Sequence, residues 1–424
     1  MDLHSESAIY AKLRRKLLPF LFVLYIVAYL DRINVGFAAL QMNRELGLSE
    51  AVFGFGAGIF FIGYSVLEIP SNLVLRQLGA RIWISRIMIS WGVVAIAMMY
   101  TRGPRSFYVL RFLLGAAEAG FFPGIIFYLT HWFPSRERAR AISLFMTAGQ
   151  IAGVIGGPLS GLFLSMNGLW HLPGWQWLFL AEGIPAVILG LATARYLPDT
   201  PEDAPWLNSS ERTMLSARLA FEREGRDSNQ TMRFVLSNGS VWLLALLDFA
   251  IVFGLYGIGL WLPQILKGFG GMSDVRVGTL SALPFLTAAV LMVIVATHSD
   301  SNGERRWHVA ISAFVAAIAL VASAAARSAW MSLITISIAS AGVTSTFGPF
   351  WTMPSRFLDG RAAAGGIALI NSTANLAGFV GPSLVGLIKE ATGSFAGGLL
   401  AMALAVMMAG VIALAMPEVE PRQV

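Results

Sequence analysis

The sequence predicts an all-α integral membrane protein with twelve transmembrane helices in two pseudo-symmetric six-helix bundles. The 424 residues are 56% hydrophobic and 13% charged, with a mean hydropathy of +0.68, whereas a soluble chain is about 25% charged. Apolar runs of about 20 residues, long enough to cross a bilayer, recur from one end of the chain to the other. The two halves of the chain also resemble each other in sequence.

Six apolar runs precede a polar stretch, and six follow it. They lie near 17–37, 52–74, 82–101, 106–130, 140–164, 175–196, 241–265, 277–298, 308–326, 329–353, 363–388 and 393–416. We therefore expect an N-terminal bundle at 1–196, a cytoplasmic linker at 197–240 and a C-terminal bundle at 241–424. Within the linker, Asn208 and Glu211 have the spacing of a capping box, which predicts a short amphipathic helix ending near Glu224.

The basic residues predict the orientation of the chain. Of the 30 Lys and Arg residues, twenty fall in segments that are cytoplasmic if the N-terminus is inside. Seven fall in the opposite loops, namely Arg44, Arg102, Arg105, Lys267, Arg276, Arg327 and Lys389. The positive-inside rule then places both termini in the cytoplasm. Because the basic residues lie in loops between apolar runs, the net charge of +6 does not indicate nucleic acid binding.

Cysteine is absent, and the five histidines show no ligand spacing. Disulfides, thiolate metal sites and cysteine nucleophiles are thereby excluded, and we expect no metal site. No nucleophile–base pair is visible either, so the sequence does not indicate an enzyme.

An internal repeat relates the two halves. The segments 132–161 and 351–386 share, in order, a Trp, Pro-Ser-Arg, a polar amide beside small apolar residues, Gly-Pro and a final Gly. The offset is about half the chain, as in many secondary transporters. The repeat places Gln150 and Asn375 at equivalent positions.

Charges within apolar runs are confined mainly to the N-terminal half. The run Ser106–Phe133, expected to cross the bilayer as one helix, contains Arg111 and Glu118, and the first run contains Asp31 and Arg32. Intramembrane charges are costly and usually face a cavity or one another. Adjacent helical residues point about 100° apart, so we expect one of Asp31 and Arg32 to face a cavity and the other to contact a neighbouring helix.

Two interpretations of these charges remain open. They are either buried ion pairs that hold helices together, or a network that couples a proton to an anion. Buried pairs are weak stabilisers, which favours the second interpretation. A carboxylate in a low-dielectric site takes up a proton more readily than one in water, and its neutralisation frees an arginine to bind a carboxylate in bidentate geometry.

The C-terminal half offers uncharged polar and aromatic groups. The candidates for a cavity are Tyr256, Trp351, Asn371 and Asn375, with Tyr64 from the N-terminal half. The asparagines, one turn apart, share a helix face, but interhelical hydrogen bonding would also explain them. Trp351 and Tyr256 could equally belong to an interfacial aromatic belt. Glu182 and Asp248, about two turns from the ends of their runs, are not expected to bind protons.

Several strings resemble the major facilitator superfamily and, within it, the anion:cation symporter family. They are YLDRINVG, RFLLGAAEAGFFPG, YLTHWFPSRERARA, WQWLFLAEGIPA, GLYGIGLWLPQ and FGPFWTMPSRFLDG. The likeness covers nearly the whole chain and is greatest to bacterial carriers of tartrate and other organic or sugar acids. It implies two six-helix bundles with a central site that opens alternately to each side of the bacterial inner membrane.

The resemblance also implies roles for individual residues. Asp31 and Glu118 match the family's protonatable carboxylates, and Arg32 and Arg111 match its substrate-facing arginines. Tyr64, Gln150 and one of the two asparagines match polar groups that line a sugar-acid site. The loops between spans 2 and 3 and between spans 8 and 9 match cytoplasmic gates, through Arg76, Arg81, Asp300 and Arg305. Leu75 stands where the superfamily usually has an aspartate, which leaves the charge pairing of this gate open.

The function we expect is therefore proton-coupled import of small organic anions, hydroxy mono- or dicarboxylates, by a monomer in the lipid bilayer. The proton is the coupling ion, and no other cofactor is expected. An anion exchanger or effluxer on the same fold is the alternative. A membrane sensor would need a soluble output domain, for which the linker is too short.

Overall fold

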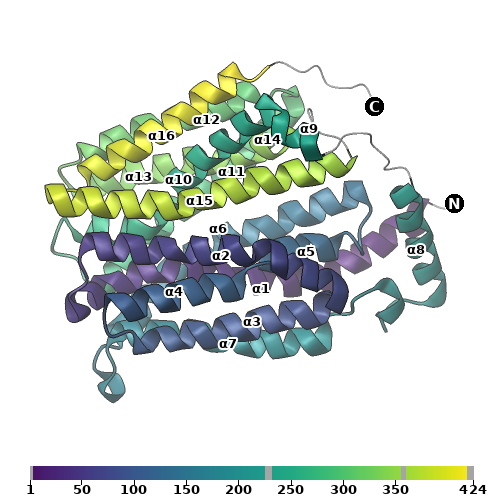
Figure 1. Ribbon diagram of the computed structural model, residues 1–424, viewed down its shortest axis with the longest axis horizontal. Helices are drawn as coiled ribbons and strands as arrows, with labels where there is room; N and C mark the ends of the chain where they lie inside the picture. The colour runs from purple at the N-terminus through teal and green to yellow at the C-terminus, as the bar shows by residue number, and fades with distance from the viewer. Residues whose placement is uncertain (1–2, 225–231, 355–359, 418–424) are drawn as a thin grey trace.

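The computed structural model describes residues 3–224, 232–354 and 360–417, and the regular secondary structure of these segments is helical. Arg226, Arg356 and Arg422, which we count on the cytoplasmic side, lie outside the described residues. In Figure 1 the helices of the two halves form two bundles side by side, and both termini emerge at the end that carries α8.

The helices of the N-terminal bundle are α1 (Leu3–Leu46), α2 (Glu50–Leu78), α3 (Ala80–Ala97), α4 (Pro104–Glu118), α5 (Phe121–Leu129), α6 (Ser135–Ser165) and α7 (Gly174–Tyr196). The C-terminal bundle contains α10 (Gly239–Lys267), α11 (Asp274–Asn302), α12 (Arg306–Ala324), α13 (Ala329–Ser345), α14 (Phe347–Trp351), α15 (Gly360–Thr392) and α16 (Ala396–Ala415). The linker contributes α8 (Ser209–Glu224) and α9 (Met232–Ser237). Eleven spans of the described chain are long and apolar enough to cross a membrane. The 33-residue α15 is the twelfth.

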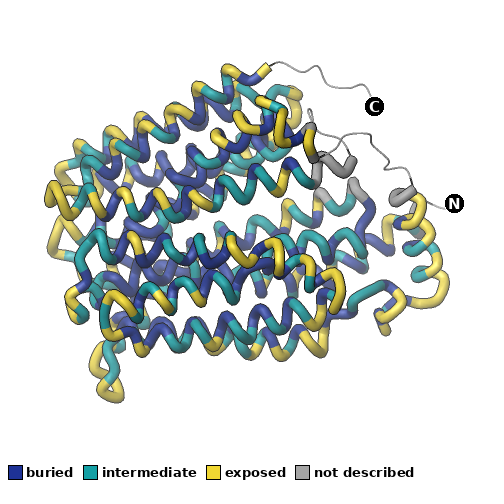
Figure 2. Tube along the Cα trace, in the orientation of Figure 1, coloured by how far each residue is buried: buried dark blue, intermediate teal, exposed yellow. Residues whose placement is uncertain are grey.

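The surface of the bundles matches a lipid environment. Large apolar side chains lie on the outward faces of long helices, with Ile188 59%, Ile318 70% and Val411 56% exposed. Figure 2 shows that residues buried between the helices alternate with residues exposed on these outer faces. A soluble protein would rarely expose so much contiguous apolar surface, so the exposed residues are those that lipid chains cover.

The expectation of one continuous helix over Ser106–Phe133 is wrong. The span is divided into α4 and α5, because Gly120 has φ 88°, a left-handed conformation that favours glycine. The carbonyl group of Ala119 has no helical donor, because the residue four positions later is Pro123. It accepts a hydrogen bond from Ser71 Oγ at 2.6 Å. Glu118 is therefore the last residue of α4. The run at 329–353 is similarly divided into α13 and α14.

The linker contains the predicted capping box. Asn208 N donates to Glu211 Oε2, and Glu211 N donates to Asn208 Oδ1, each at 2.8 Å. Glu211 also forms an ion pair of 2.7 Å with Lys12 of α1. The linker helix is thus held against the cytoplasmic extension that we predict for the first helix.

The two bundles touch backbone to backbone at the end away from the termini. A Cβ atom on Gly278 of α11 would lie 2.3 Å from the carbonyl oxygen of Gly157 on α6. Likewise, a Cβ on Gly54 of α2 would lie 2.4 Å from the carbonyl oxygen of Pro382 on α15. These two contacts occupy equivalent places in the two halves, near the starts of α2 and α11. Glycine permits this close approach, which seals the bundle interface at one end.

A larger side chain at Gly278 should therefore open this seal. We expect Gly278→Val to destabilise the closed end by about 1–3 kcal/mol through overpacking. Because the chain lacks cysteine, a single Thr344→Cys, at a buried position between the halves, reports the opening. Its labelling by a membrane-impermeant maleimide from the side away from the termini should accelerate.

The matched control is Gly239→Val, because a Cβ there meets nothing within 4 Å. Equal labelling rates in the two glycine variants would show that the Gly157–Gly278 contact does not hold the end closed.

Candidate functional site

A buried ion pair lies at the centre of the N-terminal bundle. Arg32 on α1 donates from Nε to Glu118 Oε1 at 2.7 Å, and its Nη2 lies 2.6 Å from the same oxygen. The Glu118 side chain is fully buried, and that of Arg32 is 12% exposed. The sequence left open which arginine pairs with Glu118, and the structure shows that it is Arg32.

Arg32 also connects the two halves. Its Nη1 donates a hydrogen bond of 3.3 Å to the hydroxyl group of Tyr256 on α10. The guanidinium carbon lies 5.1 Å from the ring centroid of Tyr64 on α2, a cation–π contact. One cation thus contacts a carboxylate, a phenol and an aromatic face from three other helices. A change in the charge of Glu118 would alter all of these contacts.

Asp31 points away from this centre, as the helical spacing predicts. Its Oδ2 accepts a hydrogen bond of 2.7 Å from Trp91 Nε1, and its Oδ1 accepts one of 3.0 Å from Asn34 Nδ2. The side chain of Asp31 is 1% exposed. Trp91, which sequence reasoning missed, could have been noticed as a tryptophan within an apolar run, since a buried indole N–H usually needs a partner.

Arg111 lies deeper in the N-terminal bundle than the pocket described below. Its Nη2 donates to the carbonyl oxygen of Ala57 at 3.1 Å, and its guanidinium lies 4.8 Å from the ring centroid of Phe60. Its Nε and Nη1 are buried and have no hydrogen-bond partner in the described part of the chain. Two donors of this buried cation therefore lack a hydrogen-bond partner.

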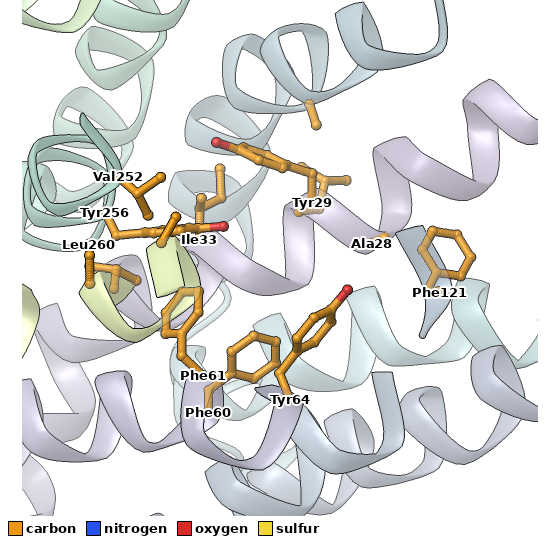
Figure 3. Close-up of a cluster of buried hydrophobic side chains, with 14 of the residues drawn as sticks. Ala28, Tyr29, Ile33, Phe60, Phe61, Tyr64, Phe121, Val252, Tyr256 and Leu260 are labelled. Carbon is orange, nitrogen blue, oxygen red and sulfur yellow. The ribbon is translucent and has the colours of Figure 1, made fainter. Parts of the chain in front are cut away.

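A pocket lies between the halves, next to the Arg32 cluster. Its lining includes Tyr29 and Ile33 of α1, Gln150 of α6 and Tyr256 of α10, together with Phe285 and Thr344. Figure 3 shows Tyr29 and Tyr256 entering the space between α1 and α10 from opposite sides. Gln150 and Tyr256, two predicted site residues, are thus brought together with the central cation.

The two candidate asparagines lie across the bundle interface from α2. Asn371 Nδ2 is 3.4 Å from Glu68 Oε1, and Asn375 lies beside the same carboxylate. Both asparagines are partly buried. Trp351, another candidate, packs against Phe350. Neither Trp351 nor the two asparagines line the pocket of the described conformation.

The charges expected to act as gates contact groups in their own halves. Arg81 lies 3.7 Å from Asp199, Arg305 lies 2.6 Å from Asp300, and Arg76 lies over the ring of Phe127. The structure does not bring these charges together across the halves. Their role as gates stays a prediction for another conformation.

Comparison with known proteins identifies the family. The Major Facilitator Superfamily model matches residues 21–382. The chain belongs to this superfamily. It is therefore a membrane transporter rather than an enzyme, as the resemblance in its sequence implies.

Two relatives and one solved structure illustrate the likeness of this superfamily member. An Agrobacterium vitis protein named "Putative tartrate transporter" is 48% identical over 420 residues, which are 99% of this chain and 93% of the relative. An Acinetobacter baumannii "Quinolone resistance transporter" is 43% identical, covering 94% of this chain and 92% of its own. A bacterial homologue of the human lysosomal transporter Spinster has the same fold, with a TM-score of 0.79 and 16% identity over 95% of this chain and 96% of its own.

The Arg32–Glu118 contact predicts a specific effect on stability. Arg32→Met would leave the fully buried Glu118 carboxylate without its cation, a change that typically costs about 3–5 kcal/mol. Adding Glu118→Gln should restore most of this loss, because the neutral amide tolerates burial better. Thermal unfolding in detergent measures both effects.

Arg81→Met is the control, since the Arg81–Asp199 pair is partly exposed and 3.7 Å long and should contribute less than about 1 kcal/mol. A double variant no more stable than Arg32→Met alone would contradict the ion pair as the cause.

Proposed function

We propose that this carrier is a proton-coupled symporter that imports small organic anions, hydroxy mono- or dicarboxylates such as tartrate or sugar acids. The observation that carries the proposal is the arrangement of Arg32 between Glu118 and Tyr256. One buried cation faces a titratable carboxylate in one half and the pocket-lining hydroxyl of the other half. Proton uptake and anion binding would then compete for the same guanidinium group.

The cycle begins with the site open to the outside. Asp31 and Glu118 take up protons, and neutral Glu118 releases Arg32. The planar fork of Arg32 then binds the substrate carboxylate in bidentate geometry. The halves rock, the anion leaves inward, and the deprotonated Glu118 pairs with Arg32 again.

The described conformation fits the last step of this cycle. The bundles are sealed at the end away from the termini, and Glu118 is paired with Arg32. If both termini are cytoplasmic, as the distribution of basic residues predicts, the seal lies on the outer side. The state is then inward-facing, with the reset ion pair formed.

Substrate selection rests on polar groups around the central cation. We assign Arg111 to a second carboxylate or to the same one, since two of its N–H groups lack partners. Gln150 and Tyr256 line the pocket. Tyr64 lies against Arg32, and Asn371 and Asn375 lie beside Glu68; we assign all five to hydrogen bonds with substrate hydroxyl groups. The name of the Agrobacterium relative supports tartrate as the first compound to test.

An exchanger or effluxer is the second candidate, and the name of the Acinetobacter relative favours it. Uptake in vesicles with imposed pH gradients of either sign separates the two directions.

We place the carrier in the bacterial inner membrane as a monomer, with the proton as coupling ion. A thermal-shift screen with tartrate, galactonate, glucarate and phthalate would identify the ligand, because a bound ligand stabilises the folded state by mass action.

Glu118→Gln should separate transport from proton coupling. The amide resembles the protonated carboxyl group, so Arg32 is freed permanently and tartrate counterflow continues. Accumulation driven by a pH gradient should fall, by about tenfold per pH unit for each proton lost. Full accumulation by Glu118→Gln in proteoliposomes would remove Glu118 from the coupling mechanism.

Arg111→Lys tests the anion site. An ammonium group cannot present a planar fork, and the loss of one charge-assisted hydrogen bond costs about 1.5–3 kcal/mol. We expect tartrate affinity, measured by calorimetry, to fall by about ten- to a hundredfold.

Arg86→Lys is the matched control, because Arg86 is also stacked on an aromatic ring, that of Trp83, but lies outside the pocket. Equal affinities in the Arg111→Lys variant and the unmodified carrier would exclude Arg111 from the site.

A further inference from the structure

A second buried acid lies beside Asp31, away from the Arg32–Glu118 pair. Glu182 on α7 is 5% exposed, and neither of its carboxyl oxygens has a hydrogen-bond partner in the described part of the chain. Its position between helices is set by Gly92 and Gly183, where a Cβ on either would lie 2.9 Å from the carbonyl oxygen of the other. This contact fixes the distance between α3 and α7 next to Glu182.

The neighbours of Glu182 come from each helix packed against α7. On α1, Asp31 is the charged group that acts on it, and Asn34 lies beside it. On α6 the neighbour is Ser160, whose buried Oγ also lacks a partner. α3 contributes the neutral Trp91, which contacts Asp31. Two cations act on this acid pair, both through Asp31, namely Arg111 of α4 and Arg32 of α1.

The hydrogen bonds distinguish the two acids. Asp31 accepts from two N–H donors, Trp91 Nε1 and Asn34 Nδ2, an environment that suits an ionised carboxylate. Asn34 and Ser160 lie beside Glu182, but its two carboxyl oxygens accept no hydrogen bond of normal geometry in the described residues. Two neighbouring carboxylates in a dry site do not both ionise readily, and an ionised group without hydrogen bonds is costly to bury.

We propose that Glu182 is a proton-binding residue that shares one proton with Asp31. In the described state the proton resides on Glu182 and Asp31 is ionised. Transfer moves one proton from a Glu182 oxygen to an Asp31 oxygen, so the pair keeps one negative charge. Neutral Asp31 no longer attracts Arg111, which links the shared proton to the second arginine of the anion site.

This inference rests on the proposed proton symport. Its test is chosen so that failure of the shared proton and failure of proton symport give different results. The pH dependence of radiolabelled L-tartrate counterflow is measured in proteoliposomes for the unmodified carrier and for Glu182→Gln. Without the second acid, Asp31 loses a like-charged neighbour and should take up its proton only at lower pH. We expect the pH of half-maximal counterflow to fall by about one unit in Glu182→Gln. Glu182→Asp keeps the carboxyl group and should reverse most of this fall.

The matched control is Asp248→Asn. Asp248 on α10 is also buried, at 1% exposed, and one of its oxygens lacks a partner, but no charged group acts on it in the described chain. Its variant should keep the original pH profile. A Glu182→Gln profile that overlays that of the unmodified carrier would overturn the shared proton.

An infrared pH titration tests the same pair without transport or ligand. The carboxylic-acid band of the pair should titrate at nearly the same pH in the unmodified carrier and in Glu182→Asp. It should titrate at lower pH in Glu182→Gln and in Asp31→Asn, where one acid takes up the proton alone. If the band of Glu182→Gln titrates at the pH of the unmodified carrier, the proposal is wrong. If pH gradients drive no tartrate accumulation in the unmodified carrier but this band behaves as expected, proton symport fails while the shared proton stands.

Discussion

The Arg32–Glu118 ion pair is the interaction on which the rest of the site depends. Removing two charges from water costs more than a single pair usually returns, so the surrounding helices must hold it in a defined geometry. The left-handed Gly120 ends α4 directly after Glu118, and Ser71 donates a hydrogen bond to the carbonyl group of Ala119. If α4 continued unbroken past Gly120, Glu118 would lie in the middle of a helix. The break makes Glu118 the last residue of α4 and thereby decides which residues surround its carboxylate.

The two halves contribute different chemistry to one symmetric scaffold. The N-terminal half supplies the buried acids and arginines, and the C-terminal half supplies Tyr256 and the asparagines of α15. The repeat makes α2–α15 and α6–α11 equivalent contacts, with glycines allowing backbone contact at one end of each. Rocking about such contacts needs little side-chain rearrangement. The charge of buried groups can therefore change in the N-terminal half while polar groups of the C-terminal half bind the substrate.

Much of the site could be predicted, because intramembrane charges are rare enough to stand out in a sequence. For this reason the sequence revealed four charged candidates, Asp31, Arg32, Arg111 and Glu118. The helical angle between adjacent residues explained why Asp31 and Arg32 diverge. Trp351 does not line the pocket of the described conformation, and its role in the site stays a prediction, since an aromatic residue near a span end does not show which way its side chain points. Glu182 was dismissed because its distance from the span end resembled that of an interfacial group, and no local pattern indicated that it packs beside Asp31.

The sequence by itself determined the membrane class, the two bundles, the capping box of the linker and the identity of the charged residues, because hydropathy, repeats and local hydrogen bonding are encoded over short stretches. Only the tertiary structure decided that Glu118 pairs with Arg32 rather than Arg111, that Arg32 reaches Tyr256, and that Glu182 lies beside Asp31. The hydrogen-bonded partners are far apart in the sequence: 86 residues separate Arg32 from Glu118, and 224 separate Arg32 from Tyr256. Their approach depends on helix packing through Gly92, Gly183 and Gly120, which no single segment specifies.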